Sequence, residues 1–498
     1  MPLIHDLWLN IADWVPALVT FSHLALSAGF IAWVLMSKTD STSAVAWCLL
    51  IMLLPFFGPL LFLLFGYQHV NRPLQRKRRH LEKYRSSVRH LVQASPGILV
   101  NAGVPDSAGA VLTRLADRFG AYPRSPDNQV DFYHDGPPAF EAMLEALEEA
   151  RHHIHLEFFI FHADEIGTKF LKVMAAKARA GVQVRMLYDA MGSHALSWRA
   201  LRDFLLGGGR SSVFLPLNLL RRRFQINMRN HRKILVVDGQ VGFTGGLNVG
   251  DEYLGKSPRY GYWRDTHMRI RGPAVEDLQR IFCEDWDFAA GERLIETEAH
   301  VSASSCGYIS GVTGAGTVPV QVIDSGPDRE FKSIREIYFA AIVNAQQRVW
   351  IASPYFVPDA GLLDALRLAG YRGIDVRFLG QLYPDKWIPQ FAARYHWDRV
   401  LRSGVKVYQY AKGMMHAKVV LVDGQWASVG TANLDNRSLH LNFEVNCLID
   451  SPQAVAQLEE QFLHDLTDSI QLQPAAYSRR PFAGRLLENA CRLFSPVL

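Results

Sequence analysis

Two long stretches near the start of the chain lack any charged side chain. Residues 14–36 and residues 44–67 contain no Asp, Glu, Lys or Arg over 23 and 24 positions. As helices, each would be about 35 Å long, enough to cross a hydrocarbon core of about 30 Å. Only residues 37–43 connect them. The pattern predicts a two-helix transmembrane hairpin within residues 1–71, with its second helix kinked by prolines.

A basic stretch follows the predicted hairpin. Residues 72–89 hold eight Lys or Arg side chains and one Glu, a net charge of +7. The whole chain carries +5, so the remaining residues carry a net −2. Positive residues beside a membrane helix stay in the cytoplasm, so we expect the large C-terminal part on the cytoplasmic side. Within a juxtamembrane linker at residues 72–109, this stretch has two interpretations, a segment that binds the anionic membrane surface and a mere topology signal, and both can hold.

Beyond about residue 110, the order of helical and strand patterns repeats. ARHHIHLEFFIFHAD, starting at Ala150, and AQQRVWIASPYFVPD, starting at Ala345, each follow a helical pattern and are typical of a buried strand. In both places a further helix and a glycine-led strand follow (GVQVRMLYD and GIDVRFLG). Alternating strands and helices predict an α/β fold for each half. The predicted segments are a first half at residues 110–300, a Ser/Gly-rich linker at residues 301–317, and a second half at residues 318–475.

The composition narrows the class of protein. Of 498 residues, 49% are apolar and 20% are charged, which excludes a disordered chain and a polytopic transporter. The five cysteines lie far apart without a CxxC pair, so we expect neither a disulfide framework nor a cysteine zinc site. Because the basic excess is confined to residues 72–89, we expect no nucleic-acid partner.

The two halves carry the same four polar residues at the same spacing. The first half contains HxKx4D followed ten positions later by asparagine, at His231, Lys233, Asp238 and Asn248. The second half repeats this order 185 residues later, at His416, Lys418, Asp423 and Asn433. One such pattern carries little weight, but its recurrence inside an internal repeat indicates one site built from both halves.

Strand geometry separates the roles of these residues. Side chains two positions apart share a face of a strand, so each histidine should point the same way as its lysine. Each aspartate has the opposite parity and precedes a glycine in a predicted hairpin turn. Although Asp238 and Asp423 complete the catalytic motif, we expect them to fix the turn rather than to touch substrate.

This pattern resembles the phospholipase D superfamily, whose hallmark is the duplicated HxKx4D motif. Within it, the chain is most similar to bacterial cardiolipin synthases with two N-terminal transmembrane helices, on segments such as NMRNHRKILVVDG, GGLNVGDEY, SPYFVPD and NLDNRSLHLNFEVN. The resemblance implies two tandem α/β sandwich halves related by pseudo-two-fold symmetry, in a multi-pass protein of the bacterial cytoplasmic (inner) membrane. The chain departs from an exact repeat at Thr431-Ala432, where the first half has Gly246-Leu247, so the two sides of the site are not identical.

Two histidines that face one phosphorus atom suit the transfer of a phosphodiester. One attacks phosphorus and forms a phosphohistidine, while the other protonates the leaving alcohol and then deprotonates the incoming one. The two motif lysines, helped by Asn248 and Asn433 as substrate-binding groups, are expected to neutralise the phosphate oxygens. This scheme requires no metal ion and no other cofactor.

A neutral nucleophilic histidine also needs an acceptor for its second ring nitrogen. The resemblance supplies an acid for this role, and the matching positions are Asp265 and Glu444. The alternative is that each acid forms an ordinary salt bridge within the sheet. Family analogy favours His231 as the nucleophile.

The resemblance implies that two phosphatidylglycerol molecules become cardiolipin and glycerol. Four alternatives stay open: a phospholipase D that uses water, a phosphatidyltransferase with another donor such as phosphatidylethanolamine, a nucleic-acid phosphodiesterase, and an inactive membrane scaffold. The sequence indicates neither the acyl-chain preference nor the oligomeric state.

Two segments mix apolar and arginine residues. They are residues 217–224 (LNLLRRRF) and residues 482–494 (FAGRLLENACRLF), the latter within an amphipathic C-terminal segment at residues 476–498. We consider two interpretations for both, an interfacial segment beside the entrance of the site and ordinary amphipathic packing.

Overall fold

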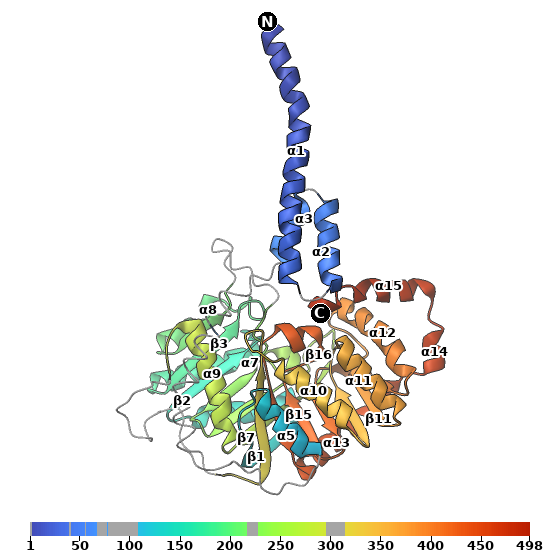
Figure 1. Cartoon of the computed structure of the whole chain (residues 1–498). Coiled ribbons are helices and arrows are strands. Elements are labelled where there is room, and N and C mark those ends of the chain that lie inside the picture. Colours follow the sequence, from blue (N-terminus) through green and yellow to red (C-terminus); the bar gives the residue numbers. More distant parts are fainter. Residues whose placement is uncertain are drawn as a thin grey trace. The chain divides into compact units, whose positions relative to one another are not determined.

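The computed structural model describes residues 2–38, 41–54, 56–66, 77, 108–216, 228–294 and 314–498. The chain divides into an N-terminal unit, residues 1–75 with 218–225, and a large unit that contains the rest (Figure 1). The predicted interfacial segment at residues 217–224, most of the basic stretch and residues 301–313 of the linker lie outside the described residues.

The N-terminal unit contains one long helix and a short helical hairpin. Helix α1 (Pro2–Ser37) has 36 residues, and its part from Leu18 to Ser37 is long and apolar enough to cross a membrane. Helix α2 (Ser41–Leu53) has 13 residues, or about 20 Å. It is followed by α3 (Phe57–Leu61) and a single π-helical turn, η1 (Phe62–Gly66). The structure therefore differs from the predicted two-helix transmembrane hairpin, because α2 ends at Leu53 and residues 57–66 form separate short helices.

The second apolar segment folds back at a glycine. Gly58 lies so close to α2 that a Cβ atom there would be 2.6 Å from the Cα of Ile51. Further on, the Phe62 ring packs against Trp33 of α1 and Trp47 of α2, with ring centroids 6.0 and 5.5 Å apart. Trp33 and Trp47 both lie near the connection between α1 and α2. The predicted kink is thus a reversal of chain direction, after which the chain runs back towards the start of α2.

One continuous sheet runs through the large unit. Its described strands follow the order β18-β12-β11-β9-β14-β15-β17-β8-β1-β7-β6-β5-β2-β3-β4. The first half contributes β1 (Ser125–Asp135), β2 (His153–Phe158), β3 (Gln183–Asp189), β4 (Arg210–Phe214), β5 (Ile234–Val237), β6 (Val241–Gly245) and β7 (Tyr262–Arg271). The second half contributes β8 (Val318–Ser325), β9 (Arg348–Ala352), β11 (Asp375–Gln381), β12 (Lys406–Tyr410), β14 (Val419–Val422), β15 (Trp426–Gly430), β17 (Glu444–Asp450) and β18 (Ser469–Gln471). Of the short strands, β13 (Gly413–Met415) pairs with β7, while β10 (Phe356–Val357) pairs with β16 (Leu434–Asp435).

The two halves place their strands in the same order. From the centre outwards, the first half runs β1-β7-β6-β5-β2-β3-β4 and the second runs β8-β17-β15-β14-β9-β11-β12, with β18 as an additional strand at its outer edge. Strands β1 and β8 join the halves as antiparallel neighbours, with Ser125 opposite Val320. This arrangement confirms the mixed α/β fold with two repeats that the alternating pattern predicts.

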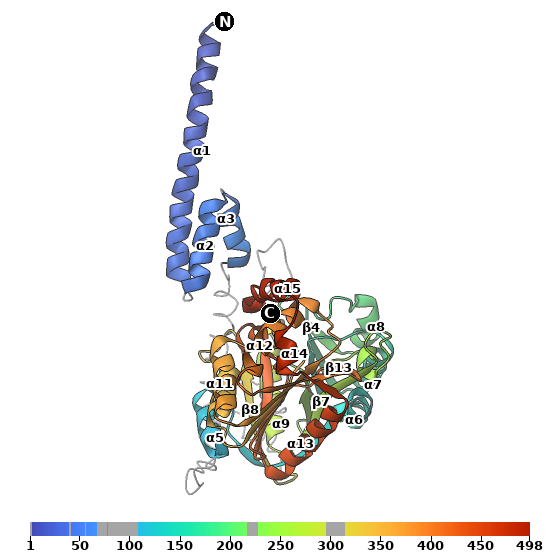
Figure 2. The same cartoon turned by 90° about the vertical axis from the view of Figure 1, so that its right-hand side faces the viewer.

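The large unit also contains helices, most of which pack against this sheet, while α14 and α15 contact α12 (Figures 1 and 2). They are α5 (Ala108–Arg118), α6 (Gly136–Glu149), α7 (Glu165–Arg179), α8 (Trp198–Leu206), α9 (Ala274–Ala290), α10 (Ser333–Asn344), α11 (Ala360–Tyr371), α12 (Trp387–Leu401), α13 (Pro452–Thr467), α14 (Pro474–Ser478) and α15 (Phe482–Arg492). Short turns of other helix types lie at η2 (Asp251–Leu254), η3 (Arg437–Leu441) and η4 (Ser495–Val497).

The halves share their apolar interior. One core cluster contains side chains of both, including Ile234, Met268, Val322 and Val445. Helix α5 lies at the start of the predicted first half, yet its Leu112 packs in the core cluster of the second half. The large unit is therefore one folded body, in which each half completes the core of the other.

One residue of the basic stretch is described, and it is buried. Lys77 is 3% exposed, and its Nζ lies 2.5 Å from Asp285 and 3.7 Å from Asp328. The same nitrogen lies 4.0 Å from the centre of the Phe443 ring. The interpretation that this stretch rests on the membrane surface is wrong for Lys77, because buried acids hold its charge inside the domain.

Candidate active site

The second half inserts a short strand beside the first half. Strand β13 pairs with the start of β7, where Met415 lies opposite Arg264. The amide of His416 donates to the Arg264 carbonyl at 2.7 Å. Because Asp265 directly follows Arg264, this pairing brings His416 next to an acid of the other half.

The first half makes the reciprocal contact. Asn230 and Phe443 form a parallel bridge, and the amide of His231 donates to the Phe443 carbonyl at 2.9 Å. Glu444 directly follows Phe443. Backbone pairing between the halves therefore positions each motif histidine beside an acid that the other half provides.

The resulting histidine–acid pairs are crossed. Nδ1 of His231 lies 2.9 Å from Oε2 of Glu444, and Nδ1 of His416 lies 2.6 Å from Oδ2 of Asp265. Both acids are fully buried, while the histidine side chains are 10% and 11% exposed. Neither Nε2 atom has a hydrogen-bond partner among the described residues. Each ring thus has one nitrogen fixed by an acid and the other available to a substrate.

The motif lysines are buried beside the histidines of their own motifs. Nζ of Lys233 donates to the His231 carbonyl at 2.8 Å. Nζ of Lys418 donates to the His416 carbonyl and lies 2.9 Å from Nδ1 of the same residue. Burial lowers the pKa of Lys233 to about 7 and the pKa of Lys418 to about 8. Both lysines are therefore close to losing their protons at neutral pH.

The surroundings favour the neutral form of both histidines. Burial, aided by the charges of Lys233 and Lys418, holds the pKa of His231 well below its usual range. Burial and Lys418 also lower the pKa of His416, but Asp265 opposes that shift. His416 is consequently the histidine that takes up a proton more readily.

The two acids differ in their tendency to ionise. Burial raises the pKa of Glu444 to about 7. Burial also opposes the charge of Asp265, yet Lys418 and His416 outweigh it and lower the pKa of Asp265. At neutral pH, His416 therefore faces a carboxylate, whereas His231 faces an acid close to its midpoint of titration.

The sequence difference between the repeats lies at these acids. Thr431 donates its hydroxyl to Oε2 of Glu444 at 2.6 Å. The corresponding residue of the first half is Gly246, where a Cβ atom would overlap Oδ1 of Asp265. The second half therefore supports its longer acid with a hydroxyl, and the first half leaves space for its shorter acid.

The motif aspartates anchor the strands beside their turns. Asp238 accepts hydrogen bonds at 2.8 Å from the amides of Arg151, His152 and His153. Asp423 accepts equivalent bonds at 2.8 to 2.9 Å from the amides of Gln346, Gln347 and Arg348. Both aspartates have a positive φ, 52° and 54°, in the turn itself. These bonds agree with the expectation that the aspartates fix the turns.

The two motif asparagines have different surroundings. Asn248 accepts a hydrogen bond from the Ile160 amide at 3.1 Å and donates to the Tyr253 hydroxyl at 2.6 Å. Oδ1 of Asn433 is buried and has no hydrogen-bond partner among the described residues. Asn248 is therefore held by the protein, whereas Asn433 keeps an acceptor for another molecule.

Sequence reasoning missed the aromatic residues around the histidines. The Phe159 ring lies 5.0 Å from the His231 ring, between centroids. The rings of Trp263 and Tyr253 lie 5.4 and 6.0 Å from that of His416. Such rings displace water and so contribute to the burial that lowers the histidine pKa values. Trp263 stands two positions before Asp265 in the sequence, but no sequence pattern assigns it a role.

A loop after β11 also reaches the site. The Tyr355 hydroxyl donates to Asp385 at 2.6 Å, and the charge of Asp385 acts on Lys418. The pKa of His231 is lowered mainly by burial and by other cations of the site, and the charge of Lys386 lowers it further. No local pattern marks this loop, because only the fold brings it to the motif residues.

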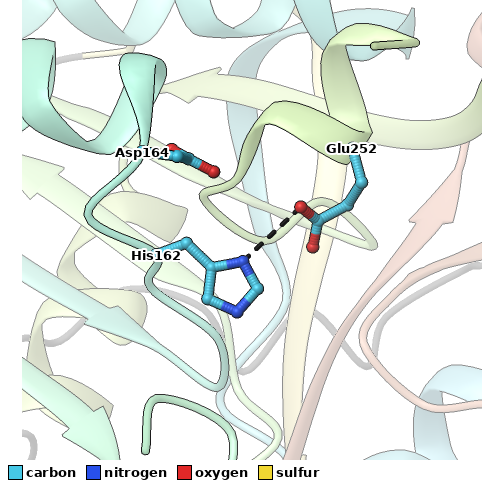
Figure 3. Close-up of side chains that lie close together, drawn as sticks. All are labelled: His162, Asp164 and Glu252. Carbon is cyan, nitrogen blue, oxygen red and sulfur yellow. Dashed lines mark ion pairs between the residues drawn. The ribbon is translucent and has the colours of Figure 1, made fainter. Parts of the chain in front are cut away.

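One cluster of described residues has the character of metal ligands. His162, Asp164 and Glu252 bring ligand atoms within 4.8 Å of one another, and His162 lies 3.5 Å from Glu252 (Figure 3). Asp164, however, caps α7, since its carboxylate accepts from the amides of Gly167 at 3.1 Å and Asp251 at 2.7 Å. We assign no metal to this cluster, because Asp164 is already engaged by backbone donors.

Comparison with known proteins identifies the relatives of this chain. Residues 143–286 and 338–466 match the family described as cardiolipin synthase, PLD-like domain, and residues 25–66 match the phospholipase D-nuclease N-terminal family. A cardiolipin synthase of Geobacillus thermodenitrificans is 41% identical over 504 residues, which cover 100% of this chain and 97% of that protein. A cardiolipin synthase of Geobacillus kaustophilus is also 41% identical and covers 95% of this chain and 93% of its own length.

A solved structure shares the fold. The crystal structure of a phosphatidylserine synthase of Haemophilus influenzae has a TM-score of 0.59 at 17% sequence identity, covering 78% of this chain and 100% of that protein. Both cardiolipin synthases are 41% identical to this chain along almost their whole length. The chain therefore belongs to the cardiolipin synthase family of the phospholipase D superfamily.

Proposed function

We propose that this protein transfers a phosphatidyl group between two phosphatidylglycerol molecules and so forms cardiolipin and glycerol. The observation that carries the proposal is the pair of crossed contacts, His231 with Glu444 and His416 with Asp265. These contacts fix the orientation of two imidazoles, as nucleophilic and acid–base catalysis on a phosphodiester requires. The names of the 41% identical relatives supply the lipid product.

His231 is the nucleophile in this proposal. Its low pKa keeps the ring neutral, so Nε2 carries a lone pair. Its Nδ1–H donates to Glu444, whose charge stabilises the positive ring that forms when Nε2 bonds to phosphorus. His416 lies against Asp265, whose lowered pKa keeps it ionised, and this carboxylate opposes the lowering of the His416 pKa, so His416 is the ring that takes up the proton and serves as the acid.

The reaction then proceeds in two displacements. Nε2 of His231 attacks the phosphorus of the first lipid, the bond from phosphorus to the glycerol headgroup oxygen breaks, and protonated His416 gives that oxygen its proton. Glycerol leaves and a second phosphatidylglycerol enters. Neutral His416 removes the proton of its headgroup hydroxyl, and the oxygen bonds to phosphorus as the bond from phosphorus to nitrogen breaks.

The buried polar residues complete the site. An anionic phosphodiester beside Lys233 and Lys418 favours their charged forms and is held by them. Oδ1 of Asn433, which lacks a partner among the described residues, is suited to accept a hydrogen bond from a headgroup hydroxyl. Asn248 acts indirectly, by holding the backbone at Ile160.

The identical strand order supports a pseudo-two-fold relation between the halves as part of this proposal. Under that relation, β13 beside β7 and the Asn230–Phe443 bridge are equivalent contacts. An axis between β1 and β8 would then bring the two motifs together on one phosphorus atom. The corresponding amide partners of Asp238 and Asp423 support the same relation.

The basic stretch at residues 72–89 supports a position of the large unit on the cytoplasmic side of the inner membrane. Within the N-terminal unit, we place α1 across the bilayer and treat α2 and α3 as a hairpin that enters and leaves on one side. The packing of Phe62 on Trp33 supports this arrangement. It replaces the predicted two crossings with one crossing followed by a re-entrant hairpin.

The decisive experiment supplies the reconstituted full chain with phosphatidylglycerol labelled in its headgroup glycerol and in its acyl chains. We expect one cardiolipin and one free glycerol for every two lipids consumed. Phosphatidate as the main product would instead indicate a hydrolase, and cardiolipin formed only after phosphatidylethanolamine is added would indicate a different donor. No turnover of either lipid would refute the proposal.

The roles of the histidines can be separated by trapping. His231→Ala and His416→Ala should each reduce transfer by about 10³-fold or more, since each removes a step that the other residue does not perform. A labelled phosphatidyl-enzyme should accumulate only in His416→Ala, which keeps the nucleophile. Label in His231→Ala alone would reverse the assignment, and full activity of either variant would contradict the scheme.

A further inference from the structure

The last long helix exposes its apolar side chains. In and just after α15, Phe482, Leu486 and Leu493 are 78%, 59% and 73% exposed. At 100° per residue, these three positions fall on one arc of the helix. A helix at a water-facing surface normally turns such an arc towards the core. In α15 the arc faces outwards, so we expect an apolar partner to cover it.

The inner face of α15 instead contains a buried ion pair. Glu488 is 2% exposed, and its carboxylate pairs with Arg480 at 2.9 Å and with Arg394 at 3.2 Å. One turn further on, Cys491 is buried against Ala392 of α12. With an ion pair inside and phenylalanine and leucine outside, α15 has the polarity of a helix that lies in a membrane interface.

A basic groove runs along the polar edge of the same helix. It has a volume of about 550 Å³ and is lined by five arginines and two acids. The arginines are Arg367, Arg399, Arg402, Arg480 and Arg485, and the acids are Asp398 and Glu488. Among the described residues, Arg399 and Arg485 have no carboxylate partner. Guanidinium groups bind phosphate in a bidentate manner, so the groove is complementary to an anionic phosphate headgroup.

This surface adjoins the catalytic site through α12. Cys491 of α15 packs with Phe391 of α12, whose ring lies 6.1 Å from that of Trp387. Trp387 is 59% exposed and directly follows Lys386, and the same cluster contains Val357 of β10, which pairs with Asp435, two residues after Asn433 of the site. Figures 1 and 2 show α15 along α12, at the end of the large unit that also holds the C-terminus. Lipid held at α15 is therefore close to the loop that reaches the histidines.

We propose that α15 and the arginine groove on its flank form a docking surface for the anionic leaflet of a bilayer. The apolar arc enters the acyl-chain region, and the groove holds the phosphate of an anionic headgroup. This inference rests on the proposed function, because it explains how a site in the large unit draws its lipids from the membrane plane. Of the two interpretations of residues 482–494, it selects the interfacial one.

Quenching by lipid-borne nitroxides tests the position of α15 in the full chain. A fluorescent label on Leu486→Cys reports the apolar arc, in a background whose reactive native cysteines are replaced by serine. The matched control is Leu463→Cys on α13, which is also exposed but lies at the opposite end of the large unit (Figures 1 and 2). In vesicles of phosphatidylcholine and phosphatidylglycerol at 7:3, we expect several-fold stronger quenching at position 486 than at position 463.

The charge of the vesicle tests the groove. Quenching at position 486 should weaken in vesicles of phosphatidylcholine alone, and Arg399→Gln with Arg485→Gln should weaken it equally in the mixed vesicles. Equal quenching at positions 486 and 463 would overturn the proposal. The proposal would also be overturned if the label at position 486 became less accessible as the number of protein molecules per vesicle rose, without any effect of the nitroxide lipid. A second copy of the chain would then cover the helix.

Activity separates docking from catalysis. Leu486→Asp with Leu493→Asp should slow cardiolipin formation in vesicles by about tenfold or more, because each leucine then loses its transfer into lipid. The same variant should keep its rate on a short-chain phosphatidylglycerol below its critical micelle concentration, and Leu486→Met should resemble the unchanged chain on both substrates. Equal losses on both substrates would refute docking, whereas failure of the unchanged chain on both would refute the proposed function.

Discussion

At the scale of single residues, the site depends on two acids that are not equivalent. Asp265 is ionised beside His416, while Glu444 titrates near neutral pH beside His231. An identical pair of acids would give two similar imidazoles, whereas the proposed mechanism needs one neutral ring and one that carries a proton. In that mechanism, the difference between the repeats at Gly246 and Thr431 is where the roles proposed for the two histidines diverge.

Gly246→Ala tests this dependence directly. The added Cβ overlaps Oδ1 of Asp265, so the carboxylate must move away from His416. We expect kcat for cardiolipin formation to fall by about 10²-fold while the fold, followed by circular dichroism, is retained. Thr431→Ser, which keeps a hydroxyl beside Glu444, is the matched variant and should stay within a few-fold of the unchanged chain. Undiminished activity of Gly246→Ala would show that the Asp265 contact is not needed.

The lysines predict how activity depends on pH. Lys233 and Lys418 have pKa values lowered to about 7 and 8, so both are charged below this range and neutral above it. Because the charged forms attract the phosphodiester, kcat/KM should fall as pH rises through 7 to 8. Steady-state rates between pH 5 and 9 would show this limb. In Lys233→Arg, whatever activity survives should fall less steeply, and a kcat/KM that rises up to pH 9 in the unchanged chain would contradict the lysine role.

At the scale of elements, the motif aspartates bind the backbone amides of neighbouring strands. Each accepts three backbone amides at the start of a central strand, β2 for Asp238 and β9 for Asp423. Both strands lead directly to a segment that borders the site. The third residue of the motif thus positions the first two through the sheet.

Asp238→Ala should therefore act on stability more than on chemistry. It leaves three amides without their acceptor, which costs about 1–3 kcal/mol for each such group that is shielded from water. We expect the melting temperature to drop by several degrees, with the rate per folded molecule reduced much less than in His231→Ala. Asp364→Ala on the surface of α11 serves as the control and should leave both unchanged. Loss of activity at an unchanged melting temperature would instead place Asp238 in the chemistry.

The sequence predicts elements better than it predicts their partners. Alternating patterns and the duplicated motif predicted an α/β fold with two repeats. The alternation of side chains along a strand predicted that the motif aspartates lie in turns. The crossed pairs did not follow, because Met415 with Arg264 and Asn230 with Phe443 pair over long sequence distances. The loop at Lys386 was missed for the same reason. The reversal at Gly58 was also missed, since apolar composition alone does not separate a straight helix from a folded one.

At the scale of the whole molecule, neither half of the large unit is complete alone. Each provides the acid for the histidine of the other, and side chains of both fill one core cluster. Lys77, which precedes the first half, adds a buried charge contact to Asp285. Separating the two halves would therefore remove both histidine–acid pairs together. We expect no transfer activity from a single half.

The N-terminal unit yields a prediction for the whole chain in its membrane. Phe62 packs on Trp33 near the end of α1, so the chain leaves the α2–α3 hairpin on the side at which α1 ends. If α1 crosses the bilayer once, the N-terminus and the large unit lie on opposite sides. Two complete crossings would place them on the same side.

Protease protection in intact cells distinguishes these cases. With epitope tags at the two ends of the full chain, external protease should remove the N-terminal tag from spheroplasts and reach the C-terminal tag only after lysis. A cysteine introduced at Ser37, where α1 ends, should react with an impermeant maleimide only after lysis, because it shares the side of the large unit. Protection of both tags before lysis would mean that residues 41–66 unfold their hairpin and cross the membrane a second time.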